Sequence, residues 1–239
     1  MKLVREPIKK ETLLCLVLAG LAHPLPANAA GPFVTDDAAI AAPHSCQLEA
    51  WKRFNRQGYE VFVLPACNPF ENWELTLGQI STTVTEGERE RQNLIQAKTV
   101  FRPIQPEQIA WGLSFGSTIH RHPSPGQERI SSVYAYVPLS YSIGVDLPLV
   151  HFNLGGFRSN DDNRNNLTWS VAVEAPLHPR LALNVEAYGD HRSAPSYQLG
   201  AAISIVPNRV QLFLLTGGRR HNRGDNGRWA TLGFSVSTK

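Results

Sequence analysis

Two nearby residues, His191 and Ser193, combine a base and a hydroxyl in one polar segment that follows Asp190. A histidine that lies against a serine hydroxyl, and is itself oriented by a third group, activates the serine as a nucleophile. Hydrolysis by a membrane-embedded enzyme is therefore one hypothesis. Because residues two apart in one loop need not meet, the alternative is a polar turn that Pro195 closes. No catalytic residue is assigned.

Three histidines, His120, His122 and His151, have the side chain most often used to bind metal ions. Only His120 and His151 take the inward parity of the strands described below, and those strands are not neighbours. No acidic partner stands close to them in sequence. A solvated rim is the favoured interpretation, so neither a metal nor another cofactor is predicted.

The tripeptide Arg223, Gly224 and Asp225 is the one that integrins recognise, and it falls in the last and longest of the expected polar loops. Residues 224–227 also have ordinary turn composition. A structural or adhesive surface protein is thus a further hypothesis.

Strands are the elements that must position these side chains. Runs of 8 to 14 residues with period-2 patterning follow one another, separated by Gly, Pro, Asn and Asp, and nothing longer than a turn predicts a helix. The twelve expected strands are approximately residues 46–54, 59–67, 73–85, 91–101, 109–121, 130–143, 149–158, 167–175, 181–190, 196–206, 210–217 and 228–237.

Four of these runs, 109–121, 167–175, 181–190 and 196–206, present one wholly apolar face. Their other faces are rich in Gly, Ser, Thr and Gln, which suits a barrel interior better than a sheet surface washed by water. A charge on a lipid-facing position costs about 2 to 4 kcal/mol near the midplane. The apolar faces are therefore expected to meet lipid.

The opposite parity supplies the candidate lumen side chains. They are Glu49, Glu74, His120, His151, Glu174, Asn184 and Glu186. Buried carboxylates need partners, and Arg53 and Lys98 are the inward cations. Acidic lumen residues would bias a pore toward cations or guide a polar solute, or they would only knit a narrow interior together. Both interpretations remain open.

The connections alternate between short, Pro-bearing turns and more polar loops, as in outer-membrane barrels with periplasmic turns and extracellular loops. The predicted fold is all-β: a transmembrane antiparallel up-and-down barrel of about twelve strands. Twelve strands lie between the eight that side chains nearly fill and the sixteen that leave an open channel, so a narrow or plugged conduit is expected.

The cysteines predict one disulfide. Cys46 and Cys67 face each other in the hairpin register that pairs Asn55 with Gly58, within bridging distance. Cys15 lies in the apolar part of an expected leader. An exported chain with two remaining cysteines is expected to pair them.

Residues 1–29 have the layout of a secretory signal peptide: basic residues, an apolar stretch and a small-x-small site at Ala27 and Ala29. Its removal leaves 19 Lys and Arg against 18 Asp and Glu, with no basic stripe of the kind that nucleic acid requires. Residues 30–45 are expected to form a periplasmic segment or plug, with the part around Thr35, Asp36 and Asp37 as the candidate plug, and residues 46–239 are expected to form the barrel.

The segments GPFVTDDA, CQLEAW, PACNPFENWELTLG, NVEAYGD and YQLGAAISIVPNRVQL resemble a family of uncharacterised proteobacterial outer-membrane barrels, loosely related to transporters of the meta-pathway of phenol degradation. The resemblance covers most of the chain after the leader and implies passage or binding of a small, hydrophobic solute. It implies location in the outer membrane of a Gram-negative bacterium, with the bilayer, lipopolysaccharide and the barrel-assembly machinery as partners. The structural rival is a soluble periplasmic lipid-binding barrel.

Overall fold

The computed structural model describes residues 32–85, 87–219 and 227–238. The expected signal peptide, residues 1–29, and the tripeptide Arg223 to Asp225 lie outside the described residues. No helix in the described part of the chain is long and apolar enough to cross a membrane.

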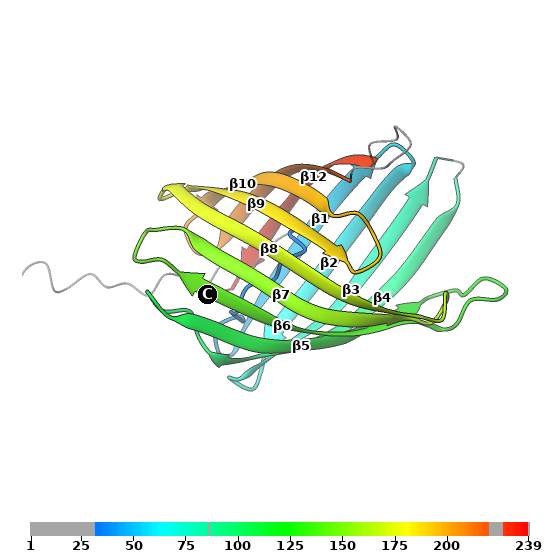
Figure 1. Cartoon of the computed structure of the whole chain (residues 1–239), viewed down its shortest axis with the longest axis horizontal. Helices are drawn as coiled ribbons and strands as arrows, with labels where there is room; N and C mark the ends of the chain where they lie inside the picture. The colour runs from blue at the N-terminus through cyan, green and yellow to red at the C-terminus, as the bar shows by residue number, and fades with distance from the viewer. Residues whose placement is uncertain (1–31, 86, 220–226, 239) are drawn as a thin grey trace, which may run out of the picture.

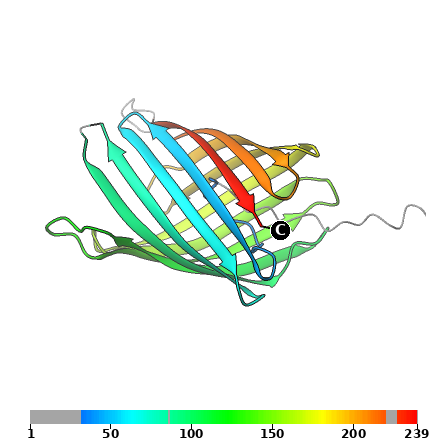
Figure 2. The same cartoon turned by 180° about the vertical axis from the view of Figure 1, so that it is seen from behind.

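Twelve antiparallel strands close into a barrel, as the period-2 patterning predicts (Figures 1 and 2). Each strand pairs with its neighbours in sequence, and β1 pairs with β12 to close the ring. The strands are β1 (Ser45–Asn55), β2 (Gly58–Asn68), β3 (Trp73–Val84), β4 (Arg89–Arg102), β5 (Ile109–His120), β6 (Ile130–Ser142), β7 (Leu149–Ser159), β8 (Arg164–His178), β9 (Leu181–Asp190), β10 (Ser196–Val206), β11 (Val210–Arg219) and β12 (Gly227–Ser237).

We call the end where β1 begins and β12 ends the terminal end, and the opposite end the loop end. The strand bounds follow the prediction closely except in β8, which is longer than residues 167–175 at both sides. Its polar start continues the ladder with β7, where Asn165 pairs with Arg158 and Asn166 with Phe157. Backbone hydrogen bonding therefore extends the strand past the apolar pattern that revealed it.

The two faces of the sheet have opposite character. Large apolar side chains are exposed on the outside, among them Leu77, Val185 and Leu214. The buried side chains of the interior are mostly small and polar, such as Ser114 and Thr231. A mostly apolar exterior around a polar interior is the arrangement of a lipid-embedded barrel.

Outward aromatic side chains lie near both ends of the strands. Trp73, Trp111 and Tyr141 belong to the terminal end, and Trp169 and Tyr197 to the loop end. Aromatic residues at these two levels are typical of the two interfaces of a membrane.

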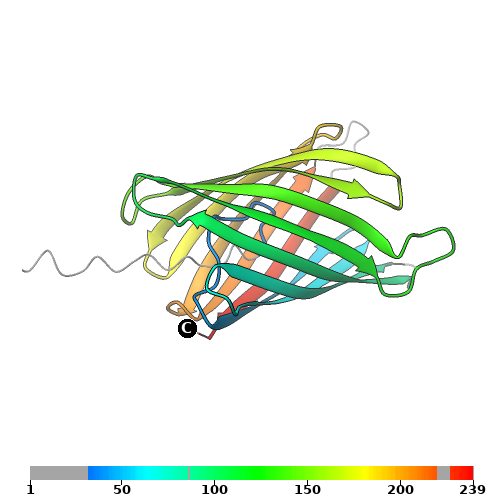
Figure 3. The ribbon, with the colours of Figure 1, turned by 90° about the horizontal axis from the view of Figure 1, so that it is seen from below.

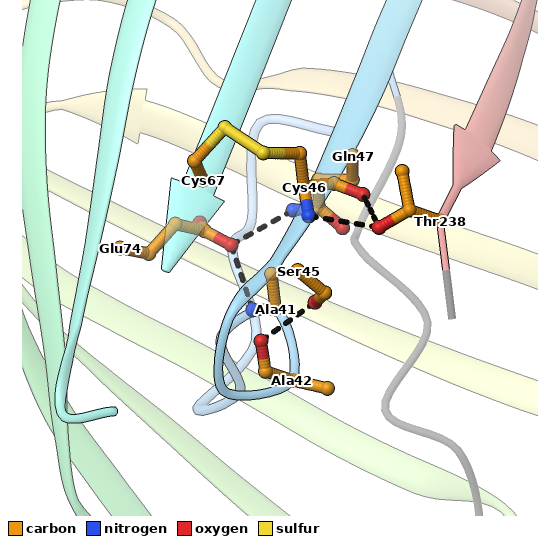
Figure 4. Close-up of a disulfide and its surroundings, with 8 residues drawn as sticks. All are labelled: Ala41, Ala42, Ser45, Cys46, Gln47, Cys67, Glu74 and Thr238. Atoms are coloured by element: carbon orange, nitrogen blue, oxygen red, sulfur yellow. Dashed lines mark hydrogen bonds between the residues drawn. A yellow bond between two sulfur atoms is a disulfide. The ribbon is translucent and has the colours of Figure 1, made fainter. Parts of the chain in front are cut away.

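The first hairpin has the register and the disulfide that the sequence predicts. Cys46 pairs with Cys67 and Asn55 with Gly58. The two cysteines are bonded, with their Cα atoms 4.0 Å apart (Figure 4). The backbone N–H of Cys46 donates to Thr238 Oγ1 over 3.0 Å, so the end of the chain is tied to the same point.

Replacing Cys46 and Cys67 by serine is expected to lower the free energy of unfolding by about 3 kcal/mol, because the bridge restricts the unfolded chain. Urea unfolding in phospholipid vesicles measures the difference. Reductant should lower the stability of the native protein toward that of the variant and leave the variant unchanged. A native protein insensitive to reductant and as stable as the variant would contradict the prediction.

Candidate functional site

The barrel interior contains the chain's own N-terminal segment, residues 32–44, drawn in blue inside the ring of strands in Figure 3. Ala38 is fully buried, and its backbone N–H donates to Ser140 Oγ on β6 over 2.8 Å. The backbone N–H and hydroxyl of Thr35 both donate to Glu186 on β9. The segment is therefore held by strands on different sides of the lumen.

An ion pair anchors the middle of the segment. Lys98 Nζ, on β4, lies 2.7 Å from Asp36 Oδ1 and 3.3 Å from Asp37 Oδ1. The lysine is 3% exposed, so water screens these pairs little. The hydroxyl of Tyr136, on β6, donates to Asp36 Oδ2 over 2.7 Å. The side chain of Asn153 forms two hydrogen bonds of 2.8 Å with the backbone of Asp36: its amide nitrogen donates to the carbonyl oxygen, and its amide oxygen accepts from the N–H.

Two of the predicted lumen glutamates accept hydrogen bonds from the segment. Glu74 Oε2, on β3, accepts from the backbone N–H of Ala41 over 2.7 Å and from Gln47 Nε2 over 3.0 Å (Figure 4). Glu186 accepts from Thr35, as described, and also from Gln198. Backbone, hydroxyl and amide donors thus bond to these carboxylates, and Lys98, one of the two inward cations that the sequence offered, lies opposite Glu74 in the register of β3 and β4.

The two inward cations form ion pairs with carboxylates outside the predicted set. Lys98 pairs with the aspartates of the segment, and Arg53 Nη1 lies 3.7 Å from Glu60 Oε2 on the neighbouring strand. The sequence could not assign these pairs, because it does not show which inward carboxylates share a level of the barrel.

The remaining predicted lumen residues also face inward. Glu174 lies opposite Asn184, which is 4% exposed, in the register of β8 and β9. His151 Nδ1 lies 2.8 Å from Ser140 Oγ, the hydroxyl that accepts from Ala38.

His120 occupies the loop end and corrects one expectation. It is 2% exposed instead of lying on a solvated rim. Its Nε2 lies 2.9 Å from Asp161 Oδ2, and its Nδ1 lies 2.9 Å from Glu90 Oε1. The absence of a nearby acid in sequence was misleading, since strand pairing brings β4 beside β5 and the β7–β8 turn supplies Asp161.

The contacts of Asp161 connect the β7–β8 turn to β5 and β6. The hydrogen bond with His120 holds the pKa of the Asp161 carboxyl below its ordinary value. Ser131 Oγ, on β6, donates to the same carboxylate over 2.8 Å. The serine therefore contacts the acid and not the histidine, unlike a catalytic triad.

His120 and His151 lie at opposite ends of the barrel, on β5 and β7. Among the described residues, no group of three or more His, Cys, Asp or Glu side chains is placed to hold a metal ion.

The pair His191 and Ser193 forms a polar turn. The ring nitrogens of His191 face the backbone N–H of Leu167, at 3.1 Å, and Nε of Arg192, at 3.0 Å. The backbone N–H of Ser193 donates to Asp190 Oδ1 over 2.8 Å. In this arrangement the imidazole is not directed at the serine hydroxyl.

A cavity of about 170 Å³ lies between the segment and the wall formed by β1 to β4. Its charged lining residues are Asp36, Asp37, Glu49, Glu74 and Lys98. Its large apolar lining residues are Phe33, Val34, Ile40, Trp51, Leu64 and Leu94. The parity of the strands predicts that Glu49 and Glu74 point inward, but the cavity itself depends on the segment.

A family model described as "Uncharacterised conserved protein UCP029691" matches residues 17–238. The chain belongs to this family. No curated protein is detectably similar to it.

Solved structures place the UCP029691 fold among outer-membrane barrels. The KdgM porin aligns with a TM-score of 0.63 at 9% identity, over 81% of this chain and 99% of that chain. The COG4313 outer membrane channel from Pseudomonas putida F1 gives 0.57 at 8% identity, over 83% and 97%. Outer membrane phospholipase A from Escherichia coli gives 0.51 at 10% identity, over 89% and 95%. At these identities the likeness shows the fold alone.

Proposed function

We propose that this protein is an outer-membrane channel for a small solute, and that residues 32–44 are a plug that closes its lumen. The observation that carries the proposal is the set of contacts between the segment and β3, β4, β6 and β9 inside a closed barrel. A segment that lies inside the barrel and is bonded to the wall at these points narrows any path along the barrel axis. A solute then passes when the segment shifts or leaves.

Two further observations support a channel. The outer face of the barrel is mostly apolar, as in barrels that contact lipid. Two of the similar structures are a porin and a channel by title. The leader at residues 1–29, export to the outer membrane, and contact with lipopolysaccharide and the assembly machinery belong to the same proposal. The hydrophobic solute implied by the meta-pathway resemblance stays a prediction.

The lumen favours cations. Its inward carboxylates include Asp36, Asp37, Glu74, Glu174 and Glu186. An excess of carboxylates along a narrow path attracts cations and repels anions.

Planar bilayers test the channel. The native protein should give small or rare conductance steps, and a variant lacking residues 33–40 should give steps that are several-fold larger. Both should show a reversal potential that favours potassium over chloride in a salt gradient. A variant with the exposed turn residue Glu107 changed to Gln, which loses one negative charge in the turn between β4 and β5, should behave as the native protein. Conductance equal to that of empty lipid for all three proteins would refute the proposal.

A further inference from the structure

The outer face of β3, β4 and β5 changes character from the loop end toward the middle of the barrel. These strands lie side by side in the sheet (Figure 1). Lys98 of β4 points into the lumen, so strand alternation places Arg89, Arg91, Asn93 and Ile95 on the outer face. Their partners on β3 are, in the same order, Thr83, Ser81, Gln79 and Leu77. From the loop end, the outer face is therefore first cationic, then polar and uncharged, then apolar.

The cationic layer consists of Arg89, Arg91 and Arg121. Arg121 follows β5, and its backbone N–H donates to the carbonyl oxygen of Arg91 over 2.9 Å, which continues the ladder between the two strands. Because His120 faces the lumen, Arg121 has the outer parity. Like charges opposite each other in a ladder destabilise a sheet. Among the residues that the structure describes, no carboxylate forms an ion pair with these three arginines, so an external anion is the partner that relieves their repulsion.

The polar layer lies next to the arginines. Gln79 and Asn93 are opposite each other on the outer face of β3 and β4, and Ser117 has the same parity on β5. An acyl chain offers no hydrogen bond to an amide, and an amide without partners is costly to remove from water. The hydroxyl groups of a sugar supply both donors and acceptors for such side chains.

The apolar layer completes the series. Leu77, Ile95 and Phe115 are exposed on the outer face of the same three strands. The outer face of β10, in contrast, is apolar from its loop end, where Tyr197 and Leu199 are exposed. The three layers therefore distinguish β3 to β5 from the opposite side of the barrel.

We infer that the outer face of β3 to β5 binds a phosphorylated glycolipid in the leaflet at the loop end. Its phosphates lie on Arg89, Arg91 and Arg121, since a guanidinium group pairs with phosphate through two parallel hydrogen bonds. Its sugars contact the polar layer and its acyl chains the apolar layer. The inference rests on the proposed function, because it needs the loop end to face outward from an outer membrane, and it assigns residues to the contact with lipopolysaccharide, a glycolipid of this class.

The test is native mass spectrometry of the full chain, folded in detergent micelles and mixed with one of three lipids. Lipid A, the phosphorylated sugar and acyl part of lipopolysaccharide, should bind. Lipid A without its phosphates and phosphatidylglycerol should each bind about tenfold more weakly or less, because the first lacks the anion and the second lacks the sugars.

Variants locate the surface. Arg91→Gln combined with Arg121→Gln should weaken the binding of lipid A by about twentyfold, since each cation near an anionic lipid contributes about fivefold. Arg180→Gln combined with Arg209→Gln removes the same charge from exposed turns at the terminal end and should leave the affinity unchanged. The shift in gel mobility between unheated and boiled samples shows that each variant is folded.

The outcomes separate the inference from the proposed function. If lipid A does not bind, if it binds equally well without its phosphates, or if the Arg91 and Arg121 variant keeps the native affinity, the inference is overturned, whatever the conductance. Phosphatidylglycerol bound as tightly as lipid A also overturns it, because the surface then takes any anionic lipid. Binding in the expected order by a protein without conductance supports the inference and removes the channel.

Discussion

Lys98→Met is expected to release residues 32–44 from the lumen and to raise the conductance several-fold. The lysine is buried and is bonded to two aspartates of the segment, so its loss leaves Asp36 and Asp37 without their ammonium partner. Removing one partner from a buried ion pair costs about 3 to 5 kcal/mol, because the remaining charge stays out of water. The segment can relieve this cost by leaving the barrel. Single-channel recording measures the larger conductance step, or the longer open time, that results.

Two other variants decide whether charge is the cause. Lys52→Met makes the same change on the outer face, where the ammonium lies over the ring of Tyr59, and should leave conductance as it is in the native protein. Adding Asp36→Asn and Asp37→Asn to Lys98→Met removes the uncompensated charges and should restore the closed state in part. If Lys98→Met and Lys52→Met conduct alike, the ion pair does not hold the segment.

The barrel was predictable from the sequence because the residues that specify each strand and its pairing are close together in sequence. Alternation along Leu181, Leu183 and Val185 shows which face is outward without knowledge of the partner strand. The register of the first hairpin follows from one tight turn, and Cys46 opposite Cys67 agrees with it. Neighbouring strands in an up-and-down barrel are neighbours in sequence, so the topology needs no long-range information.

The site was less predictable because its contacts are distant in sequence. Thr35 is 151 residues from Glu186, and Asp36 is 62 residues from Lys98. Parity shows that Glu186 and Lys98 point inward, but the height of each in the barrel depends on the accumulated register of all the strands between them. The segment itself has no periodicity, and the sequence offered only a candidate plug around Thr35, Asp36 and Asp37 without naming its partners.

His120 is a second residue whose partners could not be predicted, because they are distant from it in sequence. Its neighbours in sequence contain no acid, which suggested a solvated rim. Glu90 reaches it because β4 pairs with β5, and Asp161 because the β7–β8 turn folds toward Ser131 on β6. A residue near the end of a strand acquires partners from adjacent turns, and those turns carry no periodic signal.

Val185→Arg is expected to destabilise the protein in a bilayer by about 2 to 4 kcal/mol, because the charge would face lipid near the midplane. Val185 lies in the middle of β9 and is 56% exposed on the outer face. Urea unfolding in phospholipid vesicles measures the change, and the unheated mobility of the variant on gels shows whether the barrel forms.

Leu147→Arg is the matched control for the effect of depth. Leu147 is 47% exposed, but it belongs to the turn between β6 and β7 at the terminal end, where arginine costs about 0 to 1 kcal/mol. Water tolerates arginine equally at both positions, so only a bilayer makes the two variants differ. If both variants lose the same stability and osmotic shock releases the native protein, the apolar outer face contacts a bound lipid instead of a bilayer. The protein is then a soluble periplasmic barrel. A large loss of stability for Val185→Arg alone places the middle of β9 in the hydrocarbon layer. The level of the membrane midplane along the barrel axis is then known, and with it the level of the lumen carboxylates.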